Sequence, residues 1–137
     1  VKTSELFAGK KVVLFALPGA FTPTCSNQHF PGFINKAGDL NAKGVDLIAC
    51  LSVNDAFVMD AWGKAQGADD KVMMLGDGNG DFTKAVGLGF DGSGVGMGTR
   101  SLRYSMLIED GVVKSLNQEE NPGEAKASGV EHMLTLV

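Results

Sequence analysis

The sequence predicts an α/β fold in which helices flank a central mixed β-sheet. Five short apolar runs, rich in β-branched or aromatic residues, alternate with segments of helical spacing. Long connections separate the first three runs, whereas a tight turn joins the last two. Long crossovers favour parallel pairing and tight turns favour antiparallel pairing, so the sheet is expected to be mixed. The expected strands cover residues 11–17, 45–52, 72–75, 104–108 and 112–116.

Two longer helices are expected between these strands. Within residues 26–40, Phe30, Phe33 and Ile34 fall at helical spacing, which predicts a helix with one face on the sheet. A second helix is expected over residues 54–66, with Asn54 or Asp55 as its N-cap. Its apolar side is predicted to contain Phe57, Val58, Ala61, Trp62 and Ala65.

The C-terminal half predicts shorter elements. The Asp110-Gly111 pair signals a hairpin between the last two strands. Residues 81–86 form an expected short helix, residues 123–137 carry helical spacing, and the glycine-rich stretch 76–98 is expected to be mostly loop. A central sheet flanked by helices, with a terminal hairpin and helix, is the thioredoxin-like arrangement.

Length and composition limit the classes of function. The chain has 137 residues and a mass of 14.3 kDa, so we expect one domain over residues 1–137. A net charge of −4 without a basic block argues against nucleic acid as a partner. The longest apolar run, residues 12–17, is too short to span a membrane. Two cysteines are too few for a disulfide scaffold, so reduced thiols and a cytoplasmic location are expected, and an organellar address stays open because the sequence does not begin with Met.

Several motif-like patterns carry little weight. Gly87, Gly89 and Gly92 match the letters of a dinucleotide fingerprint but lack its strand-to-helix context. The acidic residues that follow Gly76 lack the glycine and glutamate that a calcium loop requires. The cysteines and histidines show no finger-like spacing, so neither a metal nor a cofactor is expected.

Cys25 is the strongest candidate for chemistry. It follows a buried strand, after the loop that starts at Pro18, and leads into an amphipathic helix. Unpaired N–H groups and the positive end of the helix dipole favour an anion there, which raises the thiolate fraction of a cysteine. A buried structural cysteine at a strand–helix junction is an equally weighted alternative on position alone.

Cys50, Arg100, Arg103 and His29 are weaker candidates. Cys50 lies in an apolar strand, which favours packing over a role as a resolving thiol. Arg100 and Arg103 precede the fourth strand and are expected to face opposite sides. Either both are solvated at the end of an edge strand, or one of them points at the Cys25 loop and stabilises a thiolate. His29, one turn after Cys25, either orients the site or completes the packing.

The residues around Cys25 resemble a known family. Pro18, Thr22 and Cys25 are spaced as in the Pro-x-x-x-Thr-x-x-Cys signature of peroxiredoxins. The runs Pro18–Cys25, 31–33, 49–57 and 103–106 are similar to those of the type II peroxiredoxins, the fifth and atypical class, and the similarity covers nearly the whole chain.

The resemblance implies a thiol peroxidase. The Cys25 thiolate would attack hydrogen peroxide or an alkyl hydroperoxide and become a sulfenic acid. By motif match, Thr22 would hydrogen-bond the peroxide, Pro18 would shield the sulfur, and Arg103 rather than Arg100 would be the active-site arginine. A peroxide sensor or redox relay that acts through Cys25, and a noncatalytic dimeric scaffold, are alternatives of other classes.

Two departures from the family pattern affect these expectations. No resolving cysteine stands near Ser128, so glutathione with glutaredoxin, or else thioredoxin, is expected to reduce Cys25; a disulfide with Cys50 is the lesser option. Family members usually carry a segment before the first core strand, so the resemblance implies a shortened chain or one domain of a longer polypeptide, for example one with a fused glutaredoxin domain. Relatives commonly form homodimers through their active-site ends, to which Phe21 or Phe90 would contribute.

Overall fold

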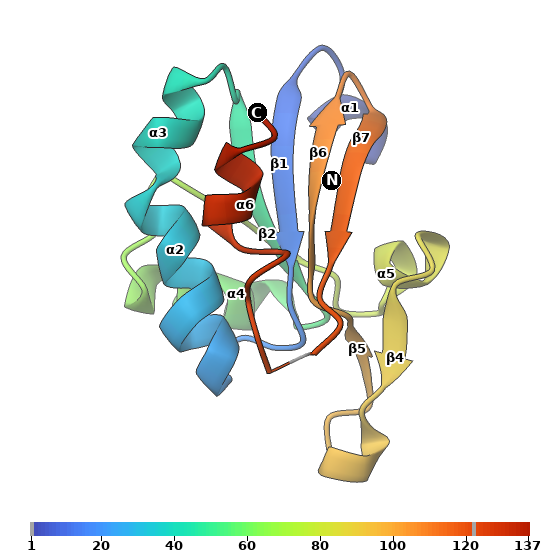
Figure 1. Ribbon diagram of the computed structural model, residues 1–137. Helices are drawn as coiled ribbons and strands as arrows, with labels where there is room; N and C mark the ends of the chain where they lie inside the picture. The colour runs from blue at the N-terminus through green and yellow to red at the C-terminus, as the bar shows by residue number, and fades with distance from the viewer. Residues whose placement is uncertain (1, 122) are drawn as a thin grey trace.

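A five-stranded sheet with the order β3-β2-β1-β6-β7 forms the centre of the computed structural model, which describes residues 2–121 and 123–137 (Figure 1). The first three strands pair in parallel, β6 is antiparallel to β1, and β7 is antiparallel to β6. This confirms the mixed sheet and all five expected strands. The expected domain over residues 1–137 includes Val1 and Pro122, which lie outside the described residues. The strands are β1 Lys11–Ala16, β2 Leu47–Ser52, β3 Met73–Gly76, β6 Tyr104–Glu109 and β7 Val112–Gln118.

The hairpin between β6 and β7 forms as its sequence predicts. Asp110 and Gly111 have φ angles of 48° and 78°, the left-handed pair that a type I′ turn requires. The Asp110 carboxylate also accepts a hydrogen bond of 2.6 Å from the Gly9 N–H, which holds the turn that leads into β1.

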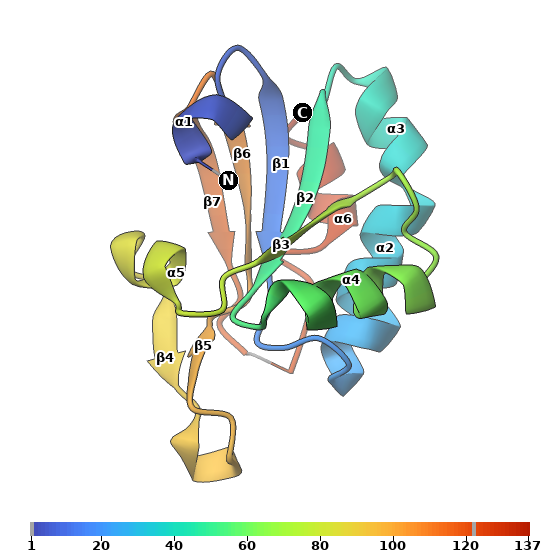
Figure 2. The ribbon, with the colours of Figure 1, turned by 180° about the vertical axis from the view of Figure 1, so that it is seen from behind.

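Helices cover the two faces of the sheet unequally. On one face lie α2 (Phe30–Asn35), α3 (Ala37–Ala42) and α6 (Val130–Leu134) (Figure 1). The short helices α1 (Thr3–Leu6) and α5 (Asp81–Ala85) lie on the other face (Figure 2). The longest helix, α4 (Ala56–Ala65), packs beside β3. No helix among the described residues is long and apolar enough to cross a membrane.

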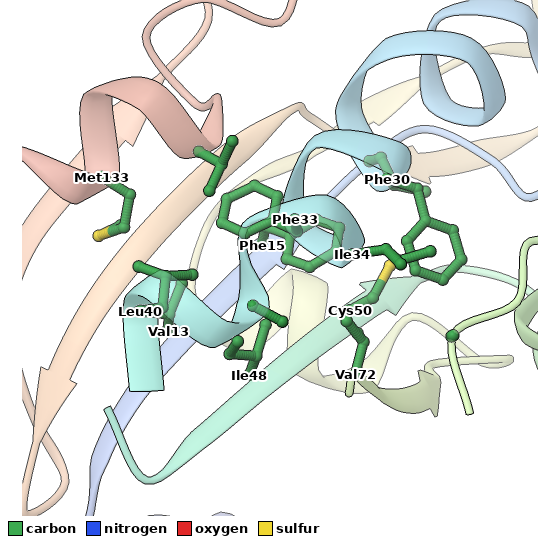
Figure 3. Close-up of a cluster of buried hydrophobic side chains, with 14 of the residues drawn as sticks. Val13, Phe15, Phe30, Phe33, Ile34, Leu40, Ile48, Cys50, Val72 and Met133 are labelled. Atoms are coloured by element: carbon green, nitrogen blue, oxygen red, sulfur yellow. The ribbon is translucent and has the colours of Figure 1, made fainter. Parts of the chain in front are cut away.

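The main hydrophobic core fills the space between the sheet and the α2, α3 and α6 layer. Phe15 of β1 stacks on Phe33 of α2 with ring centroids 4.1 Å apart, and Leu40 and Met133 close the cluster (Figure 3). Because this core fixes helix α2 against β1, it also fixes the start of the helical segment in front of α2.

The helix expected over residues 26–40 is interrupted. Helical structure begins at Pro23, passes through a π-helical turn at Cys25–His29 and breaks at Lys36 between α2 and α3. Pro31 has no N–H and its ring crowds the carbonyl of the preceding turn. The Phe30 N–H instead donates to the Cys25 carbonyl, five residues back, which widens the helix at this point.

Other differences concern α4 and the shorter elements. Asp55 is the N-cap of α4, as one of the two predicted candidates. Trp62 is buried as predicted, but Phe57 is 87% exposed and Ala61 and Ala65 are exposed as well, so those parts of the predicted apolar side were wrong. The buried face of α4 consists of Met59, Trp62 and Gly63. Gly63 lies against the Met74 side chain, which a Cβ at this position would meet at 2.8 Å. The glycine-rich stretch contains a second small sheet, β4 (Gly89–Asp91) with β5 (Thr99–Ser101), and the helix of the C-terminal segment spans α6 alone.

Candidate active site

The loop between β1 and the π-helical turn presents Cys25 at the first turns of a helix, as the sequence predicts. Phe21 takes a left-handed conformation with a φ angle of 63°, which turns the chain back toward the sheet. The Asn54 amide oxygen accepts hydrogen bonds from the Ala20 N–H (3.0 Å) and the Ser52 hydroxyl (2.7 Å). The Trp62 indole N–H donates to the Ser26 hydroxyl at 3.1 Å, so both ends of the loop are fastened to the fold.

Arg103 is the residue that meets Cys25. Its Nη2 lies 3.0 Å from Cys25 Sγ, and the two side chains are 3% and 0% exposed. A guanidinium donor at this distance in a dry site stabilises a thiolate and any oxyanion that develops beside it. The prediction that an arginine of this segment points at Cys25 is confirmed.

His29 holds the other edge of the same guanidinium. Its Nε2 lies 3.0 Å from the Ser128 carbonyl oxygen, which can only accept, so Nε2 carries the proton. Nδ1 is then free to accept from Arg103 Nη1, also at 3.0 Å. Burial, together with the charge of Arg103, lowers the pKa of His29 from 6.5 to about 3, so the ring is neutral at physiological pH. Of the two expectations for His29, its position favours orientation of the site.

The Arg100 guanidinium also reaches the Cys25 loop, where it contacts a backbone carbonyl oxygen. It donates from Nη1 to the Pro18 carbonyl (3.2 Å) and from Nε to the Met97 carbonyl (2.9 Å). The expectation that Arg100 and Arg103 face opposite sides of one strand is wrong, because β5 ends at Ser101 and β6 begins at Tyr104. The chain changes sheets between them, and both side chains converge on the Cys25 loop.

Thr22 and Pro18 occupy the same loop as Cys25 and are half-buried. The Thr22 hydroxyl donates to the Gly19 carbonyl at 2.7 Å, which fixes its rotamer and leaves its oxygen lone pairs as acceptors. Pro18 follows the buried Leu17 and is held through its carbonyl by Arg100.

Cys50 lies inside the core, as its apolar strand predicts. Figure 3 shows it on β2, in the cluster that contains Phe30, Ile34 and Val72. Burial and the nearby Cys25 raise the pKa of the Cys50 thiol well above its usual value, and Arg103 offsets this only in part. Cys50 is therefore a thiol rather than a thiolate at neutral pH. Both cysteines are free.

Sequence reasoning missed Glu119 and Ser128, which lie behind His29. The Glu119 carboxylate accepts hydrogen bonds from the Ser128 hydroxyl (2.6 Å) and N–H (2.8 Å). Nothing in their local sequence signals this role, because Glu119 and Ser128 follow Cys25 by 94 and 103 residues and only the fold brings them together. Among the described residues, no cluster of three His, Cys, Asp or Glu side chains could hold a metal ion.

Comparisons with known proteins agree with this geometry. A family model described as Redoxin matches residues 1–134. Peroxiredoxin-2C of Oryza sativa subsp. japonica is 54% identical over 98% of this chain and 82% of its own length. Reduced Prx3 of Vibrio vulnificus, solved in complex with H2O2, superposes with a TM-score of 0.94 at 57% identity, over 99% of this chain and 84% of that chain.

Two chloroplastic relatives correct one expectation. Peroxiredoxin-2E of Arabidopsis thaliana and Peroxiredoxin-2E-2 of Oryza sativa subsp. japonica are each 58% identical over 98% of this chain. The chain spans 58% and 60% of their lengths. Their location contradicts the cytoplasmic expectation. Cysteine content indicates only whether thiols stay reduced and does not identify the compartment.

The fold, the loop that carries Cys25 and the match to relatives therefore indicate the same family. The chain belongs to the redoxin family and, within it, to the type II peroxiredoxins.

Proposed function

We propose that this chain is a thiol-dependent peroxidase whose reacting atom is Cys25 Sγ. The single observation that carries the proposal is the 3.0 Å contact between that sulfur and Arg103 Nη2 at the first turns of a helix. The similar Vibrio vulnificus structure, described as a complex with H2O2, supports a hydroperoxide as substrate.

The proposed reaction is a two-electron oxidation of the sulfur. The Cys25 thiolate attacks the terminal oxygen of the hydroperoxide, the S–O bond forms and the O–O bond breaks. The departing alkoxide, or hydroxide from hydrogen peroxide, takes up a proton and leaves as an alcohol or water. Cys25 remains as a sulfenic acid. Negative charge grows on the departing oxygen in the transition state, where the fixed donors of Arg103 lower the barrier.

Thr22 and Pro18 shape the approach of the peroxide. The Thr22 hydroxyl donates its hydrogen bond to the Gly19 carbonyl oxygen. Its own oxygen therefore accepts a hydrogen bond from the O–H of the incoming hydroperoxide. Pro18 adds no N–H donor and shields the sulfur from water. These roles follow the family motif and the orientation of the Thr22 hydroxyl.

We propose that an external thiol reduces the sulfenic acid. Its sulfur attacks Cys25 and releases water, and a second thiol then breaks the mixed disulfide. Glutathione with glutaredoxin, or thioredoxin, supplies these thiols. Cys25 is fully buried, so a protein reductant reaches it only after the π-helical turn opens locally.

Cys50 is not needed for this recycling. Its thiol is buried and protonated, which makes it a poor nucleophile toward a sulfenic acid. We expect Cys50→Ser to leave steady-state turnover with glutathione and glutaredoxin within about twofold of wild type, as for a substitution outside the reacting groups. A collapse of turnover in that variant would assign the resolving role to Cys50.

The assembly and the site of action are also proposals. Phe21, Phe57 and Val95 are 58%, 87% and 77% exposed. The Cys25 loop and the β4–β5 hairpin, which carries Val95, project from the same end of the sheet (Figures 1 and 2). We propose that residues 1–137 act as one peroxiredoxin domain and pair with a second copy through this end. The chloroplastic relatives support an organellar site of action.

Peroxide consumption tests the function. Wild type and Cys25→Ser are compared with hydrogen peroxide and with an alkyl hydroperoxide, each with glutathione and glutaredoxin or with thioredoxin and its reductase. We expect sustained consumption by wild type with at least one reductant and none by Cys25→Ser. A single turnover with every reductant would favour a sensor, and no reaction would refute the proposal.

A further inference from the structure

A buried chain of hydrogen bonds connects Glu119 to the reacting sulfur. Glu119 directly follows β7 and is 8% exposed. Its Oε2 accepts from the Ser128 hydroxyl and N–H at 2.6 and 2.8 Å, and its Oε1 accepts from the Ala127 N–H at 3.2 Å. The carboxylate therefore holds Ser128 by its N–H and its hydroxyl, and so positions the residue whose carbonyl contacts His29.

The carbonyl of Ser128 lies against the His29 ring and favours one of its two neutral forms. The Ser128 carbonyl oxygen can only accept, so it selects the His29 form with the proton on Nε2. The bare Nδ1 then accepts from Arg103 Nη1, and Nη2 is aimed at Cys25 Sγ. With the proton on Nδ1 instead, two donors would face each other and the guanidinium would have to turn away.

Glu119 also holds Arg103 directly. The Glu119 N–H donates to the Arg103 carbonyl oxygen at 3.0 Å. One residue thus fastens both the backbone of Arg103 and, through Ser128 and His29, its guanidinium.

A charged carboxylate at this place has an energetic explanation. Burial raises the pKa of Glu119, but the hydrogen bonds from Ser128, Ala127 and Lys126 outweigh that effect and keep its pKa below the usual value. A carboxylate accepts at both oxygens, which an amide or an alkyl group cannot do. Accepting from Ser128 at one oxygen and from Ala127 at the other is therefore a task that only a carboxylate, Asp or Glu, performs here.

We propose that Glu119 is the positioning residue of Arg103: it fixes the Ser128 carbonyl, selects the Nε2–H form of His29 and so aims the guanidinium at Cys25. The proposal rests on the proposed peroxidase function for its rate measurement only. The other titratable or charged groups that the structure couples to this centre are Cys25, His29, Cys50 and Arg103.

The test compares Glu119→Ala and Glu119→Gln with Glu120→Gln, a change at the exposed neighbouring glutamate, all in a Cys50→Ser background so that Cys25 is the one thiol. The ¹⁵N chemical shifts of His29 report its tautomer. The pH profile of alkylation by iodoacetamide reports the thiolate of Cys25 without peroxide. The rate constant with hydrogen peroxide reports catalysis, and chemical unfolding reports stability.

We expect Glu120→Gln to match the background protein. In Glu119→Ala, the ¹⁵N chemical shifts of His29 should no longer correspond to the Nε2–H form alone. The rise of the alkylation rate with pH should move to higher pH. Its rate constant with peroxide should fall about ten- to a hundredfold, as for a misplaced catalytic group. Glu119→Gln, which retains one acceptor oxygen, should lie between the two.

A purely structural role for Glu119 would give a different result. If either folded Glu119 variant unfolds more easily but keeps the background tautomer and alkylation profile, the proposal is wrong. If the background protein fails to react with peroxide, the peroxidase function is refuted, whereas the tautomer and alkylation measurements still decide the role of Glu119.

Discussion

Arg103 matters because of its shape as well as its charge. Its two terminal nitrogens contact different partners, His29 Nδ1 and Cys25 Sγ, each at 3.0 Å. A planar guanidinium can make both contacts at once, whereas a lysine ammonium is a point charge on a flexible stem.

Replacement of Arg103 should therefore be costly even when the charge is kept. We expect Arg103→Ala to lower the rate constant of Cys25 with hydrogen peroxide by about 10²- to 10³-fold, the effect of losing one preorganised donor. Arg103→Lys should recover only part of this loss. The measurement is stopped-flow oxidation of Cys25, with Lys114→Ala, a change at an exposed cation on β7, as the control. A wild-type rate in Arg103→Ala would show that the guanidinium takes no part in the reaction.

The neutral state of His29 predicts how stability depends on pH. The pKa of His29 is lowered from 6.5 to about 3 in the folded chain. Between these values the unfolded chain binds a proton that the folded chain does not, so stability is complete above 6.5 and falls as the pH decreases. For one group the slope approaches about 1.4 kcal/mol per pH unit.

His29→Gln isolates this contribution. A glutamine amide can donate to Ser128 and accept from Arg103 without titrating. Urea unfolding between pH 4.5 and 6.5 should show a smaller slope for His29→Gln than for wild type. This pH range lies above the range in which Glu119, whose pKa is lowered, loses its charge. Equal slopes in both proteins would mean that His29 titrates normally in the folded chain.

At the level of elements, the end of β3 and the start of α4 support the loop that carries Cys25. Asn54, just before α4, accepts from the Ala20 N–H of that loop. Gly76 ends β3, and a Cβ built there would lie 2.8 Å from the Ala56 nitrogen and 3.0 Å from the Asn54 carbonyl oxygen. The two elements can meet this closely only because Gly76 has no side chain.

Gly76→Ala should separate β3 from α4. The new methyl group meets backbone atoms that cannot rotate away, and we expect a loss of about 1–3 kcal/mol in the free energy of unfolding. In Gly78→Ala the nearest atom would be 3.7 Å away, so this variant is the control and should lie within about 0.5 kcal/mol of wild type. Equal stability of the two variants in urea would show that the contact at Gly76 relaxes freely.

The sequence predicted elements well where local patterns determine them and poorly where tertiary packing does. The Asp110-Gly111 turn and the Asp55 cap were predictable because each depends on a few neighbouring residues. The buried face of α4 was predicted only in part, because it depends on packing against other elements, such as the contact of Gly63 with Met74. The β4–β5 pair was missed because each strand has only three residues and lies in a glycine-rich stretch, so no alternating pattern develops.

The site shows the same division. Pro18, Thr22 and Cys25 were predicted through their spacing in a family signature, and Arg103 through its Arg-Tyr-Ser context. Glu119 and Ser128 could not be, because neither contacts the sulfur and only the fold brings them behind His29.

At the scale of the whole molecule, the exposed apolar residues at the active-site end predict self-association. Aromatic and aliphatic side chains such as Phe57, at 87% exposure, gain free energy when a second copy covers them. We expect a solution mass near twice 14.3 kDa at micromolar concentration, measured by light scattering. Phe57→Ser combined with Val95→Ser should shift the protein toward monomer without lowering its stability. A monomeric wild type would rule out the dimer.

The central claim is that Cys25 reacts with hydroperoxides as a thiolate held by Arg103, and single-turnover oxidation tests it most directly. The reduced protein is mixed with one equivalent of hydrogen peroxide and a sulfenic-acid trap, and the labelled residue is located by mass spectrometry. We predict rapid labelling of Cys25 in wild type and in Cys50→Ser, and much slower labelling in Arg103→Ala. If Cys25 stays unlabelled in wild type, or is labelled equally fast without Arg103, the claim is contradicted.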